Sequence, residues 1–482
     1  MTHPDLVVLT PAARAIVAAV VRAGGHPLIV GGAVRDALTG ADHDGTVAIQ
    51  TLGPLDVRQL VGALQAVGRV DEPGESSGAV IVHAPGGDVE VRLPRRASSN
   101  RHRATSQRLD AADALDAADA LGDQDVTVDA IGWDPTTGHL IDPHHGVADL
   151  AAGVLRHIAV DVATDPLRVL RAVTLAGRLG FTIAPETAAL ARSTAEAVPS
   201  LVREQVWAEL VELLTRGRSF SHALTALEET GWERHLPELA ATRGVPQDPV
   251  WHPEGDVHRH LALAADAAVA IADRDGLDDD ERLLLVTTAL LHDLGKATHT
   301  HREDDGRITS RGHAHAGVAP ARALLSRVGA PAELIDQVGV LIAEHMSHLS
   351  GPTRPAVRRL LHRLAGPSGA GPSLATWARV VEADLTGREA GRKPAPGPLW
   401  LAVAATLPGG AAAAPLLRGR HLLDAGVRPG IGMAPVVTAS VRAQEAGEFD
   451  DLDGAIAWLH GFVRTGRYEA LYRAEVDRRR RS

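Results

Sequence analysis

The chain contains no cysteine, and this absence limits its chemistry. It excludes disulfide bonds, thiolate nucleophiles and zinc sites built on sulfur ligands. Any bound metal must therefore be held by imidazole and carboxylate groups, and the sequence provides 24 histidines for this purpose.

Long hydrophobic runs are also missing. No window reaches the roughly 18 to 20 apolar residues of a membrane-spanning helix. The first residues, MTHPDLVVL, lack the basic segment and apolar run of a signal peptide. We therefore expect a cytoplasmic protein without a membrane partner. The formal net charge of −11 argues against coating of nucleic acid by the whole surface, because phosphate binding needs a positive face.

The length of 482 residues predicts about three or four structural units. Up to about residue 160, short apolar runs such as AVIVHA at 79–84 alternate with helical stretches and Gly/Pro turns, which predicts an α+β head with a small mixed sheet. The rest is rich in Ala, Leu and Arg with helical periodicity, and Pro/Gly clusters divide it. The expected divisions are a head (1–160), a helical neck (161–245), a helical domain (250–390) and a C-terminal helical region (391–482).

The clearest motif of the head is LIVGGAVRD at residues 28–36, an apolar strand followed by two glycines and a helix. Glycines let backbone N–H groups approach a phosphate, and a helix start adds the positive end of its dipole. A plain tight turn could have the same sequence pattern, so the function of this motif must be inferred from the other segments of the head. These are ADHDGT with Asp44, DVEVRL with Glu90, DVTVDA at 125–130, and DPLRVLRAV from Asp165.

In this order the segments resemble the head and neck of the class II tRNA nucleotidyltransferase and poly(A) polymerase family, which includes the CCA-adding enzymes. The resemblance implies that the glycine turn holds a nucleotide triphosphate, that carboxylates hold magnesium ions, and that the neck reads the base. The nucleotide-binding positions it assigns are Gly31, Gly32, Arg35, Asp44, Glu90, Asp165, Arg168 and Arg171.

The sequence departs from this family pattern at the centre of the site. Thr46 stands at the position of the second magnesium-binding carboxylate, which a hydroxyl group cannot replace. Asp123 and Gln124 replace two arginines, and Asp129 replaces an asparagine, so acidic groups stand where triphosphate charge should be neutralised. Thr174 replaces an arginine of the neck. We therefore interpret the head as degenerate, with a vestigial or weak nucleotide site that uses magnesium only if it is active.

The helical domain carries histidines and aspartates at long intervals. They are His260, the adjacent pair His292 and Asp293 in HDLGK, His313 in RGHAHAG, and Asp384 in VEADLTGR. A His-Asp pair at the end of an apolar helix places two ligands there, and residues of other helices can complete an open metal site.

The string HDLGK, with an upstream histidine and a downstream aspartate, is similar to the HD phosphohydrolase superfamily. The expected metal ligands are His260, His292, Asp293 and Asp384, and the expected catalytic residues are His292, Asp293, Lys296 and His313. Lys296 would offset phosphate charge, and His345 is a candidate phosphate contact or second-metal ligand. Imidazole and carboxylate ligands suit a divalent transition metal, here nickel, manganese, cobalt or iron.

One group of bacterial CCA-adding enzymes carries a C-terminal HD domain, and the segments GHAHAGVAPARALL, LIAEH and VEADLTGR resemble its landmarks. In those relatives the domain hydrolyses 2′,3′-cyclic phosphates and 2′-phosphates. The leading hypothesis is therefore a metal-dependent phosphohydrolase acting on nucleotide or RNA-end phosphates, with tRNA as a candidate substrate and the head as a docking surface. The alternatives are a working CCA-adding or poly(A)-adding enzyme and a catalytically dead RNA-binding protein. The oligomeric state is left open.

Overall fold

The computed structural model separates into two units, Met1–His235 and Leu236–Ser482. The residues it describes are 3, 5–41, 46–52, 57–71, 79–92, 117–158, 166–194, 202–366, 369–388, 394–407, 415–445, 447–449 and 451–481. Among these residues, no helix combines the length and the apolar character needed to cross a membrane.

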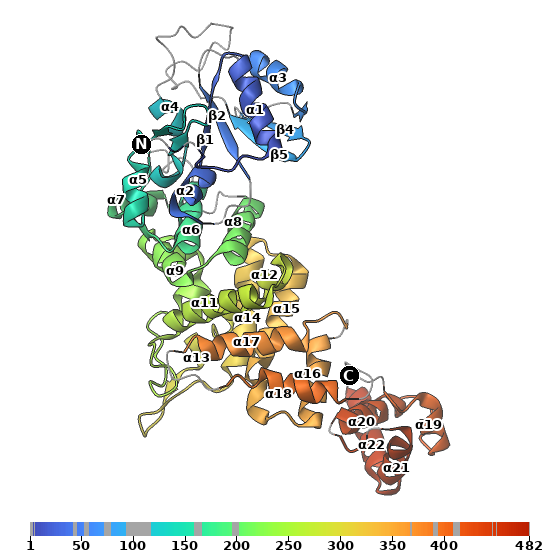
Figure 1. The fold of residues 1–482 in the computed structure, drawn as a ribbon. Helices are drawn as coiled ribbons and strands as arrows, with labels where there is room; N and C mark the ends of the chain where they lie inside the picture. The colour runs from blue at the N-terminus through green and yellow to red at the C-terminus, as the bar shows by residue number, and fades with distance from the viewer. Residues whose placement is uncertain are drawn as a thin grey trace. The chain divides into compact units, whose positions relative to one another are not determined.

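A mixed sheet of seven strands organises the first unit (Figure 1). In chain order the strands are β1 (His26–Val30), β2 (Ala48–Leu52), β3 (Arg69–Val70), β4 (Ala79–Ala84), β5 (Gly87–Arg92), β6 (Gly132–Trp133) and β7 (Leu140–Ile141). Their order across the sheet is β3-β4-β5-β2-β1-β6-β7. The described neighbours pair antiparallel except β2 and β5, which are parallel. The α+β prediction for the head is confirmed.

Strand β1 lies inside this sheet between β2 and β6, and both of its faces are covered. Leu28 and Val30 pack with Leu121 of α4 (Ala117–Leu121) and with Ala130. Side chains alternate between the faces of a strand, so Ile29 points to the opposite face. Helix α1 (Pro11–Arg22) lies against β1 and β5, and α3 (Val57–Gln65) lies beside it (Figure 1).

The strand register brings three predicted segments to one end of the sheet. Val30 pairs with Ala48 across β1 and β2, and Ala48 pairs with Glu90 across β2 and β5. The chain leaves β1 through Gly31, whose positive φ of 75° favours glycine, and then enters α2 (Gly32–Thr39). The glycine turn, the start of β2 and Glu90 therefore lie near one another.

Helices follow the sheet in the remainder of the first unit. They are η1 (Thr127–Asp129), α5 (Gly146–Ala152), α6 (Leu167–Leu179), α7 (Pro185–Thr194), α8 (Arg203–Arg216), α9 (Phe220–Glu229) and η4 (Trp232–His235), with a short strand pair β8 (Val154–Leu155) and β9 (Thr182–Ile183). Helix α6 packs against α8 and α9. A Cβ atom at Gly177 would lie 2.5 Å from Leu213 Cδ1, so glycine permits the close approach of α6 and α8.

The second unit is helical apart from one hairpin, as far as it is described. Its elements are α10 (Pro237–Ala240), α11 (Val257–Asp275), α12 (Asp279–Leu291), α13 (Lys296–His299), β10 (His301–Arg302), β11 (Ile308–Thr309), α14 (His313–Val328), α15 (Ala332–Glu344), η5 (His345–Ser350), α16 (Arg354–Ala365), α17 (Leu374–Thr386), α18 (Gly397–Ala405), α19 (Gly419–Asp424), α20 (Met433–Glu445), α21 (Leu452–Arg464) and α22 (Arg467–Arg481). The predicted helical character of this half is confirmed.

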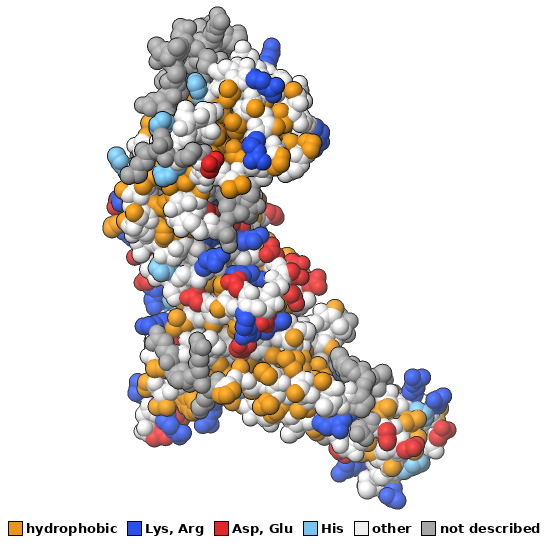
Figure 2. Space-filling view, in the orientation of Figure 1, with side chains coloured by type: hydrophobic (Ala, Val, Ile, Leu, Met, Phe, Trp, Pro, Cys, Tyr) orange, Lys and Arg blue, Asp and Glu red, His pale blue; other side chains and the backbone are white. Residues whose placement is uncertain are grey.

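Helix α11 is the centre of the predicted metal domain and packs against α12 and α17. The side chains of Asp256 and Asp278 cap the starts of α11 and α12 by accepting hydrogen bonds from backbone N–H groups. Figure 2 shows acidic side chains gathered over the start of α12, where Asp278 is followed by Asp279, Asp280 and Glu281. From Leu283 to its end at Leu291 helix α12 is mostly apolar, so it delivers the next two residues, His292 and Asp293, into the interior.

Candidate functional site

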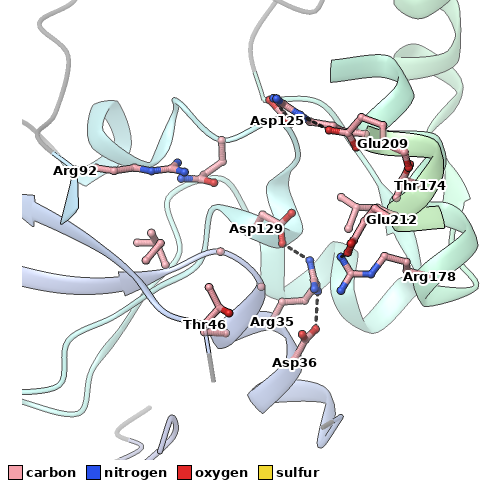
Figure 3. Close-up of a pocket in the computed structure, with 18 residues that line it drawn as sticks. Arg35, Asp36, Thr46, Arg92, Asp125, Asp129, Thr174, Arg178, Glu209 and Glu212 are labelled. Carbon is pink, nitrogen blue, oxygen red and sulfur yellow. Dashed lines mark hydrogen bonds and ion pairs between the residues drawn. The ribbon is translucent and has the colours of Figure 1, made fainter. Parts of the chain in front are cut away.

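A pocket of about 380 Å³ lies in the first unit beside the glycine turn (Figure 3). Its charged lining consists of the carboxylates Asp36, Asp125, Asp129, Glu209 and Glu212 and the guanidinium groups Arg35, Arg92, Arg171 and Arg178. Five negative and four positive groups nearly balance. The pocket is therefore not a strongly positive phosphate site by itself.

The predicted nucleotide residue Arg35 is held by two of these acids. Its Nη1 lies 2.5 Å from Asp129 Oδ1 and its Nε lies 2.8 Å from Asp36 Oδ1, as the dashed lines in Figure 3 show. Burial alone would lower the pKa of Arg35, but Asp129 and Asp36 outweigh it and raise that pKa. Burial raises the pKa of Asp129, and Arg35 opposes this effect. Arg35 thus braces the turn against η1.

Asp125 connects the sheet region to the neck helix α6. Its carboxylate lies 3.2 Å from Arg168 Nε and 3.3 Å from Arg171 Nη1. Arg171 also contacts Glu209 on α8 at 3.1 Å. Each of four carboxylates that line the pocket is therefore paired with an arginine: Asp36, Asp125, Asp129 and Glu209. The expectation that Asp129 simply repels a triphosphate does not account for its ion pair with Arg35.

The remaining predicted head residues divide into three groups. Gly31 and Gly32 line the pocket at the start of α2. Glu90 is paired with Arg92, whose Nε lies 2.6 Å from its Oε1. Asp44 and Asp165 lie outside the described residues.

The substituted positions are also placed. Thr46 and Thr174 line the pocket, and the Thr174 hydroxyl donates a hydrogen bond to the backbone carbonyl of Glu209. Gln124 lines it too, whereas Asp123 is exposed. The negative charge of Asp123 is thus turned to solvent.

The second unit brings the four predicted metal ligands together. His260 lies in the first turn of α11, His292 and Asp293 follow α12, and Asp384 lies on α17. His260 Nε2 is 3.2 Å from Asp384 Oδ1 and 3.6 Å from Asp293 Oδ2. His292 Nε2 is 3.3 Å from Asp293 Oδ2 and 3.8 Å from Asp384 Oδ1. Ligand atoms around one four-coordinate ion are roughly 3.3 to 3.6 Å apart, so this spacing fits a divalent metal.

The hydrogen bond of the ring nitrogen that faces away from the cluster also supports a metal site. His292 donates its Nδ1–H to the carbonyl of Ala289, because a carbonyl oxygen can only accept. In the neutral ring, Nε2 then carries the lone pair. Among the described residues, the buried Nε2 atoms of His260 and His292 and the Oδ1 atom of Asp293 have no hydrogen-bond partner. Converging lone pairs without donors are the arrangement that a cation satisfies.

Two further histidines face the other oxygen of Asp293. His313 Nε2 lies 3.1 Å and His345 Nε2 lies 3.8 Å from Asp293 Oδ1, and the two ring atoms are 3.2 Å apart. Both rings donate Nδ1–H to backbone carbonyls, of Ser310 and Ile342. Burial lowers the pKa of His345 to about 3, so this ring is neutral at pH 7.

A buried lysine and a partly buried arginine complete the electrostatics of the centre. Lys296 Nζ lies 2.6 Å from Asp293 Oδ2 and donates to Gln247, and Arg388 Nη2 lies 2.7 Å from both oxygens of Asp384. Burial alone would raise the pKa of Asp293 and Asp384, but Lys296 and Arg388 with nearby imidazoles hold both pKa values well below the usual range. Both carboxylates are therefore ionised. Lys296 contacts a predicted ligand and does not project freely toward a phosphate.

Three residues around this centre were not predicted from the sequence. Arg388 follows Asp384 by one helical turn, and a search for i,i+4 ion pairs would have found it. His252 and Glu254 lie in WHPEGD, just before the cap of α11. Both are buried, and their place immediately upstream of His260 is the only sequence signal for them. A pocket of about 990 Å³, lined by Trp251, His252 and Lys296 among others, opens beside the metal cluster.

The fold and the two clusters define the class of protein: a class II nucleotidyltransferase head followed by an HD domain. Residues 28–156 match the Poly A polymerase head domain, and residues 257–378 match the HD domain. The Multifunctional CCA protein of Xanthomonas oryzae pv. oryzae is 36% identical over 375 residues, which cover 75% of this chain and 85% of that protein. The protein of the same name from Xylella fastidiosa is 36% identical over 379 residues, covering 75% and 83%. The chain belongs to the family of multifunctional CCA proteins.

Solved structures show the same fold at lower sequence identity. The Bacillus stearothermophilus CCA-adding enzyme in complex with CTP has a TM-score of 0.60 and 20% identity, covering 95% of this chain and 99% of that one. The Thermotoga maritima CCA-adding enzyme in complex with tRNA has a TM-score of 0.55 and 15% identity, covering 93% and 94%. The shared architecture thus extends over both units.

These findings correct the leading functional hypothesis, which placed the main activity in the HD domain and treated the head as degenerate. The curated relatives that share 75% of the chain are CCA proteins, and the similar structures are CCA-adding enzymes. They favour the alternative, a CCA-adding enzyme. The hypothesis rested on substitutions in the head, among them Thr46, Gln124 and Asp129, and the sequence does not reveal that Asp129 is ion-paired with Arg35.

Proposed function

We propose that this protein is a tRNA nucleotidyltransferase that adds CTP-derived and ATP-derived nucleotides to the 3′ end of tRNA. The observation that carries the proposal is the 36% identity to a Multifunctional CCA protein over 375 residues. Complexes of CCA-adding enzymes with CTP, with ATP and with tRNA share this fold, which supports the same substrates here.

The pocket of the first unit is the proposed nucleotide site. Gly31 and Gly32 present a turn without side chains at the start of α2, where backbone N–H groups can approach phosphate oxygens. Arg171 is the proposed contact from the neck, because it lines the pocket on α6 and is held by Asp125 and Glu209. Arg35 is proposed to brace the turn.

The near balance of charge in this pocket has a consequence for the substrate. A nucleoside triphosphate carries several negative charges, and the lining offers four guanidinium groups beside five carboxylates. We therefore propose that the nucleotide enters as its magnesium complex, whose reduced charge suits the lining. Nucleotide binding should weaken when magnesium is chelated.

The HD centre is proposed to hold a divalent cation through His260, His292, Asp293 and Asp384. Within the described residues, the buried Nε2 atoms of His260 and His292 converge on these carboxylates and have no hydrogen-bond partner. Nickel, manganese, cobalt and iron are the candidates. His313 and His345 are proposed to bind a second cation on the Oδ1 side of Asp293. A divalent cation supplies Lewis acidity at this position.

Incorporation of labelled CTP and ATP into tRNA that lacks its terminal CCA tests the proposed activity directly. The unaltered chain should incorporate both nucleotides with magnesium. Arg171→Ala should lower kcat/KM by about 10- to 100-fold, the usual effect of losing a charge-assisted contact. Arg322→Ala is the matched control, because this exposed arginine of α14 forms an ion pair with Asp336 and lies outside the head. Absence of incorporation by the folded, unaltered chain would overturn the proposal.

A further inference from the structure

Glu254 is a buried carboxylate that lies just outside helix α11. It is 2% exposed, and its Oε1 atom lies 2.8 Å from the Nδ1 atoms of both His252 and His260. The two rings stand edge to face, with centroids 4.7 Å apart and an interplanar angle of 82°. One carboxylate oxygen therefore accepts hydrogen bonds from both imidazole rings.

We propose that Glu254 is a positioning residue of the metal centre: it fixes His260 in the tautomer that directs an unprotonated Nε2 at the cation. This assignment goes beyond the nucleotide addition proposed for the head and concerns the HD centre alone.

The tautomer follows from the chemistry of the acceptor. An ionised carboxylate can only accept hydrogen bonds, so His260 must donate through Nδ1–H. The neutral ring then has its lone pair on Nε2. That atom is the one that lies 3.2 Å from Asp384 Oδ1 and has no hydrogen-bond donor among the described residues. The opposite tautomer would place a lone pair of Nδ1 against the charge of Glu254.

His260 requires such a partner because of its place in the helix. His292 and His345 follow the ends of α12 and α15, where the carbonyls of Ala289 and Ile342 have no partner further along the helix and accept the ring N–H. His260 lies in the first turn of α11, where the carbonyl three residues earlier, at Val257, belongs to the helical hydrogen-bond ladder. The acceptor must therefore come from outside the helix.

His252 provides the second hydrogen bond that holds the carboxylate in place. Its Nδ1 lies 2.8 Å from Glu254 Oε1, and because a carboxylate can only accept, this ring atom donates its N–H. His252, Glu254 and His260 could also form a separate metal group by distance alone. A cation there would require both Nδ1 atoms unprotonated, which would place the His260 proton on Nε2 and remove this ring from the central cluster.

The experiment measures nickel binding to the full chain after removal of bound metal, by calorimetry in competition with a chelator. Glu254→Gln should weaken nickel binding by about 10- to 100-fold, as loss of a supporting partner of a metal-bound histidine does. The matched control is Asp149→Asn, because Asp149 is also buried and accepts hydrogen bonds from Thr127 and Arg156 but lies in the first unit. It should leave the nickel affinity unchanged.

A second readout separates positioning from a merely structural role. In the metal-free, unaltered protein, the ¹⁵N shifts of His260, assigned by comparison with His260→Asn, should show the proton on Nδ1. A proton on Nε2 would overturn the proposal even if Glu254→Gln does not fold. An unchanged nickel affinity in folded Glu254→Gln, accompanied only by a lower unfolding temperature, would also overturn it.

Discussion

Arg35 Nη1 lies 2.5 Å from Asp129 Oδ1 at the edge of the head pocket. The side chains are 4% and 16% exposed, so the pair is largely shielded from solvent. The sequence resemblance implies asparagine at the position of Asp129, and a lone carboxylate there would repel a triphosphate. In the folded chain it instead fixes an arginine of the GGAVRD turn, and the substitution supports the pocket wall.

Asp129→Asn tests this relationship. The substitution removes the charged partner of a buried guanidinium group, so we expect the free energy of unfolding to fall by about 1 to 3 kcal/mol. Loss of one negative charge from the lining should also tighten the binding of magnesium-CTP. Urea unfolding and a fluorescence titration with magnesium-CTP measure the two effects. Weaker CTP binding would contradict the proposed balance of charge, and Asp134→Asn, in an exposed turn of the same unit, controls for the loss of one carboxylate.

His292→Ala tests the metal cluster. Removal of this ring deletes a ligand atom and leaves a cavity next to His260 and Asp384. Nickel affinity should therefore fall by more than the ~10- to 100-fold expected for loss of a supporting residue. His315→Ala is the control, because His315 is exposed on the same domain. Elemental analysis after dialysis against nickel gives the bound metal per chain. Equal nickel content in the two variants would exclude His292 as a ligand.

Gly295→Ala examines the glycine of HDLGK. A Cβ atom there would lie 2.0 Å from the carbonyl oxygen of His313 and 2.6 Å from Gly317 N, so α14 would have to move. We expect a loss of about 1 to 3 kcal/mol in unfolding free energy and weaker nickel binding, since His313 begins α14. Gly461→Ala in α21 has no atom within 4 Å of the added group and should stabilise the protein by about 0.5 to 1 kcal/mol. Thermal unfolding compares the two.

His83 on β4 should titrate above its ordinary pKa. Hydrogen bonds to Asp71 and then Asp88, each 2.8 Å, raise that pKa. A raised pKa stabilises the fold below the ordinary value near 6.5, and this contribution is lost as the pH rises through the higher value. NMR titration should show a lower pKa in Asp71→Asn and, because the cluster is exposed, a smaller shift at high salt. No change in Asp71→Asn would contradict the assignment.

Much of the fold could be predicted because its signals are local. The apolar run of β1 and the glycine turn mark a strand and a helix start, and the Ala/Leu periodicity marks α11 and α12. The parallel pairing of β2 with β5 could not be read in this way, since it joins segments about 40 residues apart through backbone hydrogen bonds that any residue can form.

The same distinction between local and long-range signals applies to the functional residues. His260, His292, Asp293 and Asp384 were found because metal ligands need particular residue types, and the structure brings them together. The pairing of Asp129 with Arg35, 94 residues away, depends on tertiary structure and was not foreseen. The interpretation of the head as degenerate also rested on Thr46, Asp123 and Gln124, which this ion pair does not involve.

Three of the histidine rings at the HD centre are oriented by main-chain carbonyls, those of Ala289, Ser310 and Ile342. A carbonyl group is the same whatever side chain accompanies it. Ring orientation at these positions is therefore set by the backbone and can survive extensive divergence of the surrounding side chains. Of the histidine rings at the HD centre, only His260 is oriented by another side chain, that of Glu254. Position 254 is therefore where sequence divergence is expected to disturb the centre first.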